Sequence, residues 1–151
     1  MIKVLVVEDS PVVAEFLSYL LNSDPEIQVL GIARNGEEAI QMAKEKKPDV
    51  ITMDITMPRM NGFEATRRIM ETAPTPIVIV SASYEPQEVT TAFQAIEAGA
   101  LAVVGKPKAI GHADLERTAK EFIQTIKLMS EVKVVRRWPK KRETVFAGAK
   151  L

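Results

Sequence analysis

Five short apolar segments, each followed by a stretch with helical periodicity, constrain this chain more than any other feature. The apolar segments are rich in β-branched residues and span residues 3–7, 27–33, 50–53, 77–80 and 101–104. Each is too short for a buried helix, which favours strands that are covered on both sides. The helical stretches span residues 11–21, 35–47, 63–71, 87–97 and 114–131. Strands that alternate regularly with helices predict an α/β fold, in which a parallel sheet carries helices on both faces.

Composition excludes several classes of site before any motif is considered. The chain has 151 residues, of which 46% are hydrophobic and 26% are charged, as expected for one globular domain. It has no cysteine and a single histidine, His112, which excludes disulfides, cysteine-ligated metals and multi-histidine metal sites. No apolar run approaches the roughly 20 residues of a membrane helix, and the N-terminus lacks the layout of a signal peptide. We therefore expect a cytoplasmic protein without membrane contacts.

The formal charge is zero overall, but it is divided unevenly along the chain. Residues 1–132 carry 13 Lys and Arg against 19 Asp and Glu, whereas residues 133–151 carry seven against one. An acidic body with a basic end predicts a folded domain over residues 1–130 and a basic linker or tail over residues 131–151. Residues 136–142 combine an aromatic side chain with positive charge, as nucleic-acid contacts do. The acidic body and the lack of a second folded domain make nucleic-acid binding the disfavoured alternative.

Charged and hydroxyl side chains lie where the predicted strands end. The first, third, fourth and fifth strands end, respectively, in Glu8 and Asp9, in Asp54, in Ser81 and in Lys106. Because functional groups in such sheets collect at the carboxyl ends of the strands, we expect these side chains to share one pocket. Three carboxylates repel one another unless a cation is bound, and a few carboxylates with retained waters suit Mg²⁺. Lys106 and Ser81 would then hold a phosphoryl group, which Asp54 would accept as a nucleophile.

The motifs that carry these residues resemble the landmarks of bacterial response-regulator receiver domains. The matching segments are Val6–Ser10, Met53–Gly62, Val80–Ala82 and Gly105–Pro107. The resemblance covers residues 1–130 and implies a flavodoxin-like (βα)5 doubly wound sheet with the strand order 2-1-3-4-5. It also implies that Asp54 accepts a phosphoryl group from the phosphohistidine of a sensor histidine kinase.

The same resemblance implies roles for the other residues of the pocket. Asp9 and Asp54 would ligate Mg²⁺, Glu8 would act mainly through water, and Thr56 would contribute its backbone carbonyl. Ser81 and Lys106 would contact the phosphoryl oxygens. The peptide bond between Lys106 and Pro107 would be cis, a rare isomer that is retained for function.

One position departs from the receiver pattern. Receivers usually carry an aromatic residue three positions before the lysine, and here that position is Val103. A stiff β-branched side chain cannot make the inward swing of an aromatic ring. We therefore expect phosphorylation to cause a small backbone change from Ser81 to Pro86 instead of a rotamer change at residue 103.

Within the receivers, several segments are similar to chemotaxis protein-glutamate methylesterases of the CheB type. These segments are residues 57–62, 99–101 and 106–108, and the last helix runs into Val132–Arg137 as their interdomain linker begins. Such proteins carry a C-terminal catalytic domain, and this chain stops too early to contain one. Two functions remain open. One is the regulatory domain of a methylesterase, with that domain or chemoreceptors as partners. The other is a free-standing receiver that acts by protein–protein contact, for instance as a homodimer, or else the receiver of a DNA-binding response regulator.

Overall fold

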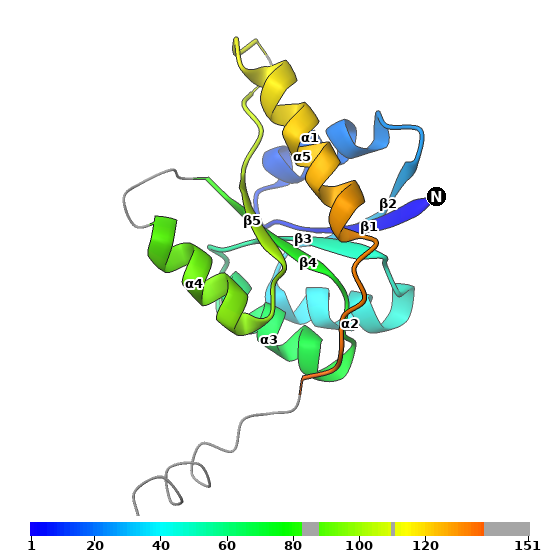
Figure 1. Ribbon diagram of the computed structural model, residues 1–151, viewed down its shortest axis with the longest axis vertical. Coiled ribbons are helices and arrows are strands. Elements are labelled where there is room, and N and C mark those ends of the chain that lie inside the picture. The colour runs from blue at the N-terminus through cyan, green and yellow to red at the C-terminus, as the bar shows by residue number, and fades with distance from the viewer. Residues whose placement is uncertain (83–87, 110, 138–151) are drawn as a thin grey trace, which may run out of the picture.

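Five parallel strands form a single sheet in the order β2-β1-β3-β4-β5 in the computed structural model, which describes residues 1–82, 88–109 and 111–137 (Figure 1). The strands are β1 (Ile2–Val7), β2 (Ile27–Ala33), β3 (Val50–Asp54), β4 (Ile77–Ser81) and β5 (Ala102–Gly105). Each strand is followed by a helix: α1 (Pro11–Asn22), α2 (Gly36–Lys46), α3 (Gly62–Thr72), α4 (Glu88–Ala98) and α5 (Leu115–Met129). The flavodoxin-like fold and its strand order are confirmed.

Side-chain caps explain where three of the helices begin. The Oγ of Ser10 accepts a hydrogen bond from the amide of Val13, and Pro11 occupies the first helical position, as the sequence predicts. Asn35 and Asn61 cap α2 and α3 in the same way. α4 ends before Gly99, whose φ of 114° belongs to the left-handed region that favours glycine.

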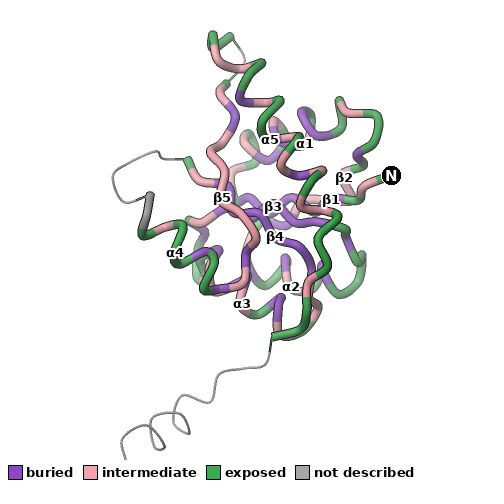
Figure 2. The backbone as a smooth tube through the Cα atoms, viewed as in Figure 1, coloured by how far each residue is buried: buried purple, intermediate pink, exposed green. Residues whose placement is uncertain are grey.

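The helices cover both faces of the sheet, and the buried strands separate the core into two layers (Figure 2). α1 and α5 cover one face, and α2, α3 and α4 cover the other. Because successive strand residues point to opposite faces and both faces are covered by helices, the strands are largely apolar along their length. The first layer includes Leu17, Leu21, Phe122 and Ile126, and the second includes Ala39, Ile69, Met70 and Ala95.

The two edges of the sheet have different neighbours. All strands are parallel, so their carboxyl ends lie together, and this end of the sheet, where the predicted pocket is expected, is called the carboxyl edge. The opposite end of the sheet is called the amino edge. Residues 130–137 leave α5 at the opposite edge and reach the C-terminal ends of α3 and α4, where the amide of Arg137 donates to the carbonyl of Met70 at 2.9 Å. In the described part of the chain, no helix has the length and apolar character that a bilayer crossing requires. Most of the predicted basic tail, residues 138–151, lies outside the described residues.

Candidate functional site

Three carboxylates from the ends of β1 and β3 meet in one pocket. Glu8, Asp9 and Asp54 each place one carboxylate oxygen within 4.8 Å of the other two. The sheet register explains this arrangement, because Val7 of β1 is paired with Met53 of β3 and the acids follow directly. Glu8 is only 2% exposed and Asp54 is 7% exposed, whereas Asp9 is open to solvent. The fold therefore brings together the three acids that the sequence singled out.

Lys106 reaches the same pocket from the end of β5. Its Nζ lies 3.2 Å from Oε1 of Glu8 and 3.5 Å from Oδ1 of Asp54. The backbone amide of Lys106 donates to the carbonyl of Ser81 at 2.9 Å, which holds the loop after β5 against the end of β4. One ammonium faces three carboxylates, so the ionised pocket carries an excess of negative charge.

This excess alters the acidity of Asp54. Burial, reinforced by the negative charge of Glu8, raises the pKa of Asp54 to about 7, although the Lys106 ammonium opposes the shift. Oε1 of Glu8 lies at ion-pair distance from Lys106 but accepts no hydrogen bond from the described residues. A buried carboxylate oxygen without a hydrogen bond is costly. Both observations fit a pocket that holds a hard cation on oxygen ligands.

The other residues that the sequence singled out are Ser81, Thr56 and Val103. Ser81 ends β4, is partly buried, and is paired with Gly105, the residue before the lysine. Thr56 is exposed two positions after Asp54. Val103 is partly buried and packs against the core layer below α3 and α4. Of residues 81–86, over which a backbone change is expected, residues 83–86 fall outside the described residues.

A close approach of backbone segments shapes the loop after Asp54. A Cβ atom on Gly62 would lie 2.1 Å from the carbonyl oxygen of Asp54, so only glycine fits there. The amide of Gly62 donates to the carbonyl of Ile55 at 2.8 Å, and the amide of Ile55 donates to Oδ1 of Asp54 at 2.9 Å. α3 thus begins directly against the residue that carries the central carboxylate. Sequence reasoning identified this loop but missed the role of its glycine.

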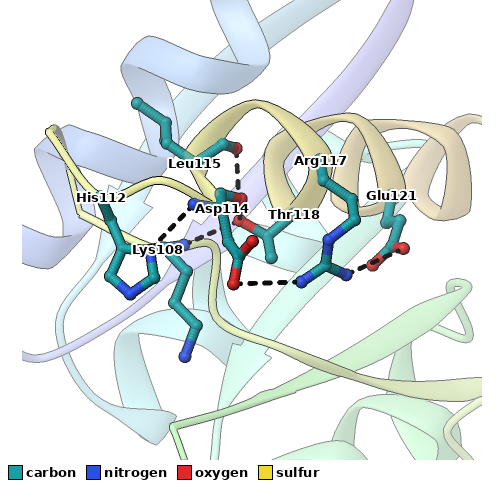
Figure 3. A network of polar contacts seen from close by, with 7 residues as sticks. All are labelled: Lys108, His112, Asp114, Leu115, Arg117, Thr118 and Glu121. Carbon is teal, nitrogen blue, oxygen red and sulfur yellow. Dashed lines mark hydrogen bonds and ion pairs between the residues drawn. The ribbon is translucent and has the colours of Figure 1, made fainter.

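The loop between β5 and α5 is fastened to the helix by Thr118 (Figure 3). The Oγ1 of Thr118 accepts from the amide of Lys108 at 3.0 Å and donates to the carbonyls of Asp114 and Leu115, at 2.8 and 3.2 Å. The loop that contributes the pocket lysine is therefore tied to the first turn of α5. Sequence reasoning missed this residue, because a threonine inside a helix gives no sign that it reaches a loop ten positions earlier.

One expectation about this loop is wrong. The bond between Lys106 and Pro107 is trans, because the described residues contain no cis peptide bond. The trans isomer of an X–Pro bond is intrinsically preferred by about 0.5–1 kcal/mol. His112 is exposed, and its Nδ1 accepts from the amide of Asp114 at 2.9 Å (Figure 3).

Comparison with known proteins agrees with this geometry. Residues 4–118 match the response regulator receiver domain family. The chain belongs to this family. It is 65% identical over 142 residues to a protein-glutamate methylesterase/protein-glutamine glutaminase of Nitrosospira multiformis, a match that covers 94% of the chain and 40% of the relative. A relative of the same description from Syntrophus aciditrophicus is 58% identical over 138 residues, with 91% and 39% covered.

Solved structures give the same result for this receiver. The response regulator domain of Thermotoga maritima CheB matches with a TM-score of 0.78 and 38% identity, and 88% of this chain and 98% of that chain are covered. A chain in the complex of the CheA3 P1 domain with CheY6 from R. sphaeroides matches with a TM-score of 0.72 and 26% identity, with 87% and 98% covered. The protein is thus a receiver of the CheB type, and it spans about two fifths of the length of the methylesterase relatives.

Proposed function

We propose that this receiver accepts a phosphoryl group on Asp54 in a Mg²⁺-dependent reaction, and that phosphorylation regulates a methylesterase domain. The observation that carries the proposal is the convergence of Asp54, Lys106 and two further acids at one edge of the sheet. A carboxylate can form an acyl phosphate, and the surrounding charges suit the oxygens of a phosphoryl group.

Mg²⁺ would be held by the carboxylates of Asp9 and Asp54, by Glu8 mainly through water, and by the backbone carbonyl of Thr56 as a further ligand. The donor set supports this assignment, because it offers only oxygen atoms and leaves Oε1 of Glu8 without a hydrogen bond from the described residues. When bound, Mg²⁺ supplies positive charge that neutralises the phosphoryl oxygens. A cation in this pocket also favours the ionised form of Asp54, which the reaction requires.

The remaining steps belong to residues of this chain. A carboxylate oxygen of Asp54 attacks phosphorus while the bond from phosphorus to the donor's imidazole nitrogen breaks, and that nitrogen takes up a proton. The Lys106 ammonium, whose backbone amide is bonded to Ser81, would pair with one phosphoryl oxygen. The Ser81 hydroxyl, at the adjacent strand end, would donate to another.

The partners follow from the relatives. A sensor histidine kinase is the proposed donor, and the likeness to a structure titled as CheA3 P1 domain with CheY6 supports it. A methylesterase domain is the proposed effector, because relatives with that description are 58–65% identical over this region. Both partners would meet the receiver in the cytoplasm.

A second candidate is a receiver that acts by protein–protein contact alone. It is favoured by two large apolar side chains on α4, Phe93 and Ile96, which are 69% and 54% exposed. Sedimentation with and without beryllofluoride, a phosphoryl mimic, tests this alternative. A dimer that forms with the mimic and is lost in Phe93→Ser would support it, and a monomer under both conditions would exclude self-association.

The phosphoacceptor is tested by intact mass spectrometry after incubation with acetyl phosphate and Mg²⁺. The protein should gain one phosphoryl group, and Asp54→Asn should gain none. Asp49→Asn is the matched control, because Asp49 is an exposed aspartate that only caps the amide of Lys3. Labelling of Asp54→Asn at the wild-type level would refute the assignment.

The effector is tested by joining this receiver to the catalytic domain of the Nitrosospira relative. Hydrolysis of receptor methyl esters should rise when acetyl phosphate is added, and the rise should be absent in Asp54→Asn. Equal hydrolysis with and without the phosphodonor would refute the proposed effector. The assignment of Asp54 as phosphoacceptor would not be affected.

A further inference from the structure

Two consecutive arginines outside the five-helix body cap the ends of two helices. Neither α3 nor α4 has a basic residue in its last turn. The Nε of Arg136 donates to the carbonyl of Glu71 at 2.8 Å, and the guanidinium of Arg137 donates to the carbonyl of Glu97. Carbonyls at a helix C-terminus lack partners within the helix and carry partial negative charge, so arginine suits them. Residues 134–137 are named the strap below.

Arg137 bridges the two helices by itself. Its backbone amide donates to the carbonyl of Met70 at the end of α3, while its side chain reaches Glu97 near the end of α4. The side chain passes over Gly99, where a Cβ atom would lie 3.4 Å from Cδ of Arg137. Val134 packs against the core layer below the same helices. The strap is therefore seated by apolar and polar contacts together.

Both helices connect the strap to the phosphoacceptor pocket. α3 begins at Gly62, against the backbone of Asp54, and ends at the strap. α4 follows β4, which ends at Ser81, and its last residues also contact the strap. A shift of α4 relative to α3 changes the separation of the two carbonyls that Arg137 spans. The strap contacts thus depend on the relative position of the two helices.

We propose that the C-terminal ends of α3 and α4 form a docking surface for the strap, and that phosphorylation of Asp54 weakens this docking. The inference rests on the proposed function of Asp54. The similarity to methylesterase relatives supports it, because a match of 142 residues extends well beyond residue 118, where the family match ends, and includes the strap. Release of the strap would transmit the phosphorylation state of Asp54 to the residues that follow residue 137.

Hydrogen exchange measured by NMR tests the release in the full chain. With Mg²⁺ alone, the Arg137 amide should be protected by its bond to Met70. Adding beryllofluoride should lower that protection at least threefold. The Ile55 amide, which is bonded to Asp54, reports binding of the mimic independently through its chemical shift.

Linkage provides a second measurement, because coupling between two sites is reciprocal. If docking opposes the phosphorylated state, Arg137→Gln should bind beryllofluoride at least about threefold more tightly than the wild type. Lys133→Gln is the matched control, since it removes the same charge from an exposed residue of the same segment. Its affinity should equal that of the wild type.

The outcomes separate the two proposals. An Ile55 signal that does not respond to beryllofluoride would overturn the proposed function, and the strap inference with it. An Ile55 signal that shifts, with unchanged Arg137 protection and equal affinities in wild type and Arg137→Gln, would overturn the strap inference alone. A tighter affinity in Lys133→Gln as well would show a general charge effect and would also overturn it.

Discussion

The two edges of the sheet use the same kinds of charged side chain with opposite results. At the carboxyl edge, one ammonium faces three carboxylates, and burial raises the pKa of Asp54 to about 7. At the amino edge, Nζ of Lys127 lies 3.0 Å from Asp24 and 2.8 Å from Glu26. There the hydrogen bond from the backbone amide of Glu26 makes the largest contribution to lowering the pKa of Asp24, and the hydrogen bond from Lys127 lowers it further.

The difference lies in how completely each charge is satisfied. At the amino edge, the hydrogen bonds that Lys127 donates to Glu26 and Asp24 raise the pKa of Lys127, and the pKa of Asp24 is lowered, so both of these groups are stabilised in their charged forms. That arrangement fastens the end of α5 to the turn before β2, where one ammonium faces two carboxylates, of which that of Glu26 is exposed to water. The carboxyl edge is under-neutralised, which destabilises the fold but creates affinity for a cation.

Removal of Mg²⁺ is expected to have the largest effect, and only on the carboxyl edge. Chelation with EDTA should slow labelling by acetyl phosphate by roughly 100-fold or more, because a metal ion contributes several kcal/mol to such a transition state. Lys127→Met should be labelled at the wild-type rate in Mg²⁺. Equal labelling rates with and without EDTA would contradict the cation site.

The acids should contribute unequally to the cation site. Asp9→Asn is expected to weaken Mg²⁺ binding by about tenfold, which corresponds to about 1.4 kcal/mol. Glu8→Gln should weaken it less, because the proposed contact of Glu8 is through water. Titration of Mg²⁺ followed by NMR or fluorescence measures both. Equal affinities in the wild type and Asp9→Asn would be incompatible with the ligand set.

Metal-free stability should depend on pH in opposite directions at the two edges. The pKa of Asp54 rises from 3.8 in the unfolded chain to about 7 in the fold, so the folded state holds the proton more tightly. The free energy of unfolding therefore falls as pH rises from about 4 to 7. Asp54→Asn should gain on the order of 1–2 kcal/mol at pH 8 and nothing near pH 4, after allowance for partial exposure.

Asp24→Asn is the comparison that sharpens this test. The pKa of Asp24 is lowered in the fold, so its contribution is present above pH 4 and is lost as pH falls through the folded value. The variant should lose stability at pH 8 and match the wild type in strong acid. Urea unfolding across this pH range measures both variants, and changes of the same sign would remove the contrast between the edges.

The bond from Thr118 to the loop tests the scaffold of the carboxyl edge. Thr118→Val keeps the shape of the buried side chain but leaves the amide of Lys108 without its acceptor, so it should cost about 1 kcal/mol. Thr118→Ser restores the hydroxyl and should recover most of that stability. Thermal unfolding measures both, and equal losses in Val and Ser variants would assign the effect to packing.

The smallest effect is expected from Lys127→Met at the amino edge. The ion pairs of Lys127 are accessible to water, so their loss should lower the unfolding midpoint only slightly. The difference from the wild type should shrink further in high salt, because exposed charges are screened. A midpoint change larger than that of Thr118→Val would mean that this edge matters more than its exposure indicates.

The sequence by itself determined the elements, their order and the residues at the strand ends. The apolar runs are continuous because both faces of the sheet are covered, and helix starts such as Ser10–Pro11 depend only on neighbouring residues. Since all strands are parallel, residues that follow them are placed at one edge whatever the details of packing. Glu8, Asp54 and Lys106 could therefore be assigned to one pocket before any contact was known.

Only the tertiary structure decided which distant groups meet. It left Oε1 of Glu8 without a hydrogen bond among the described residues and made Lys106–Pro107 trans. It also seated Arg136 on a carbonyl 65 positions earlier in the chain, in a segment whose composition indicates no more than a basic linker. Such contacts depend on where helix ends and loops lie in space. The periodicity of apolar residues does not predict these positions, because it reflects only which residues are buried.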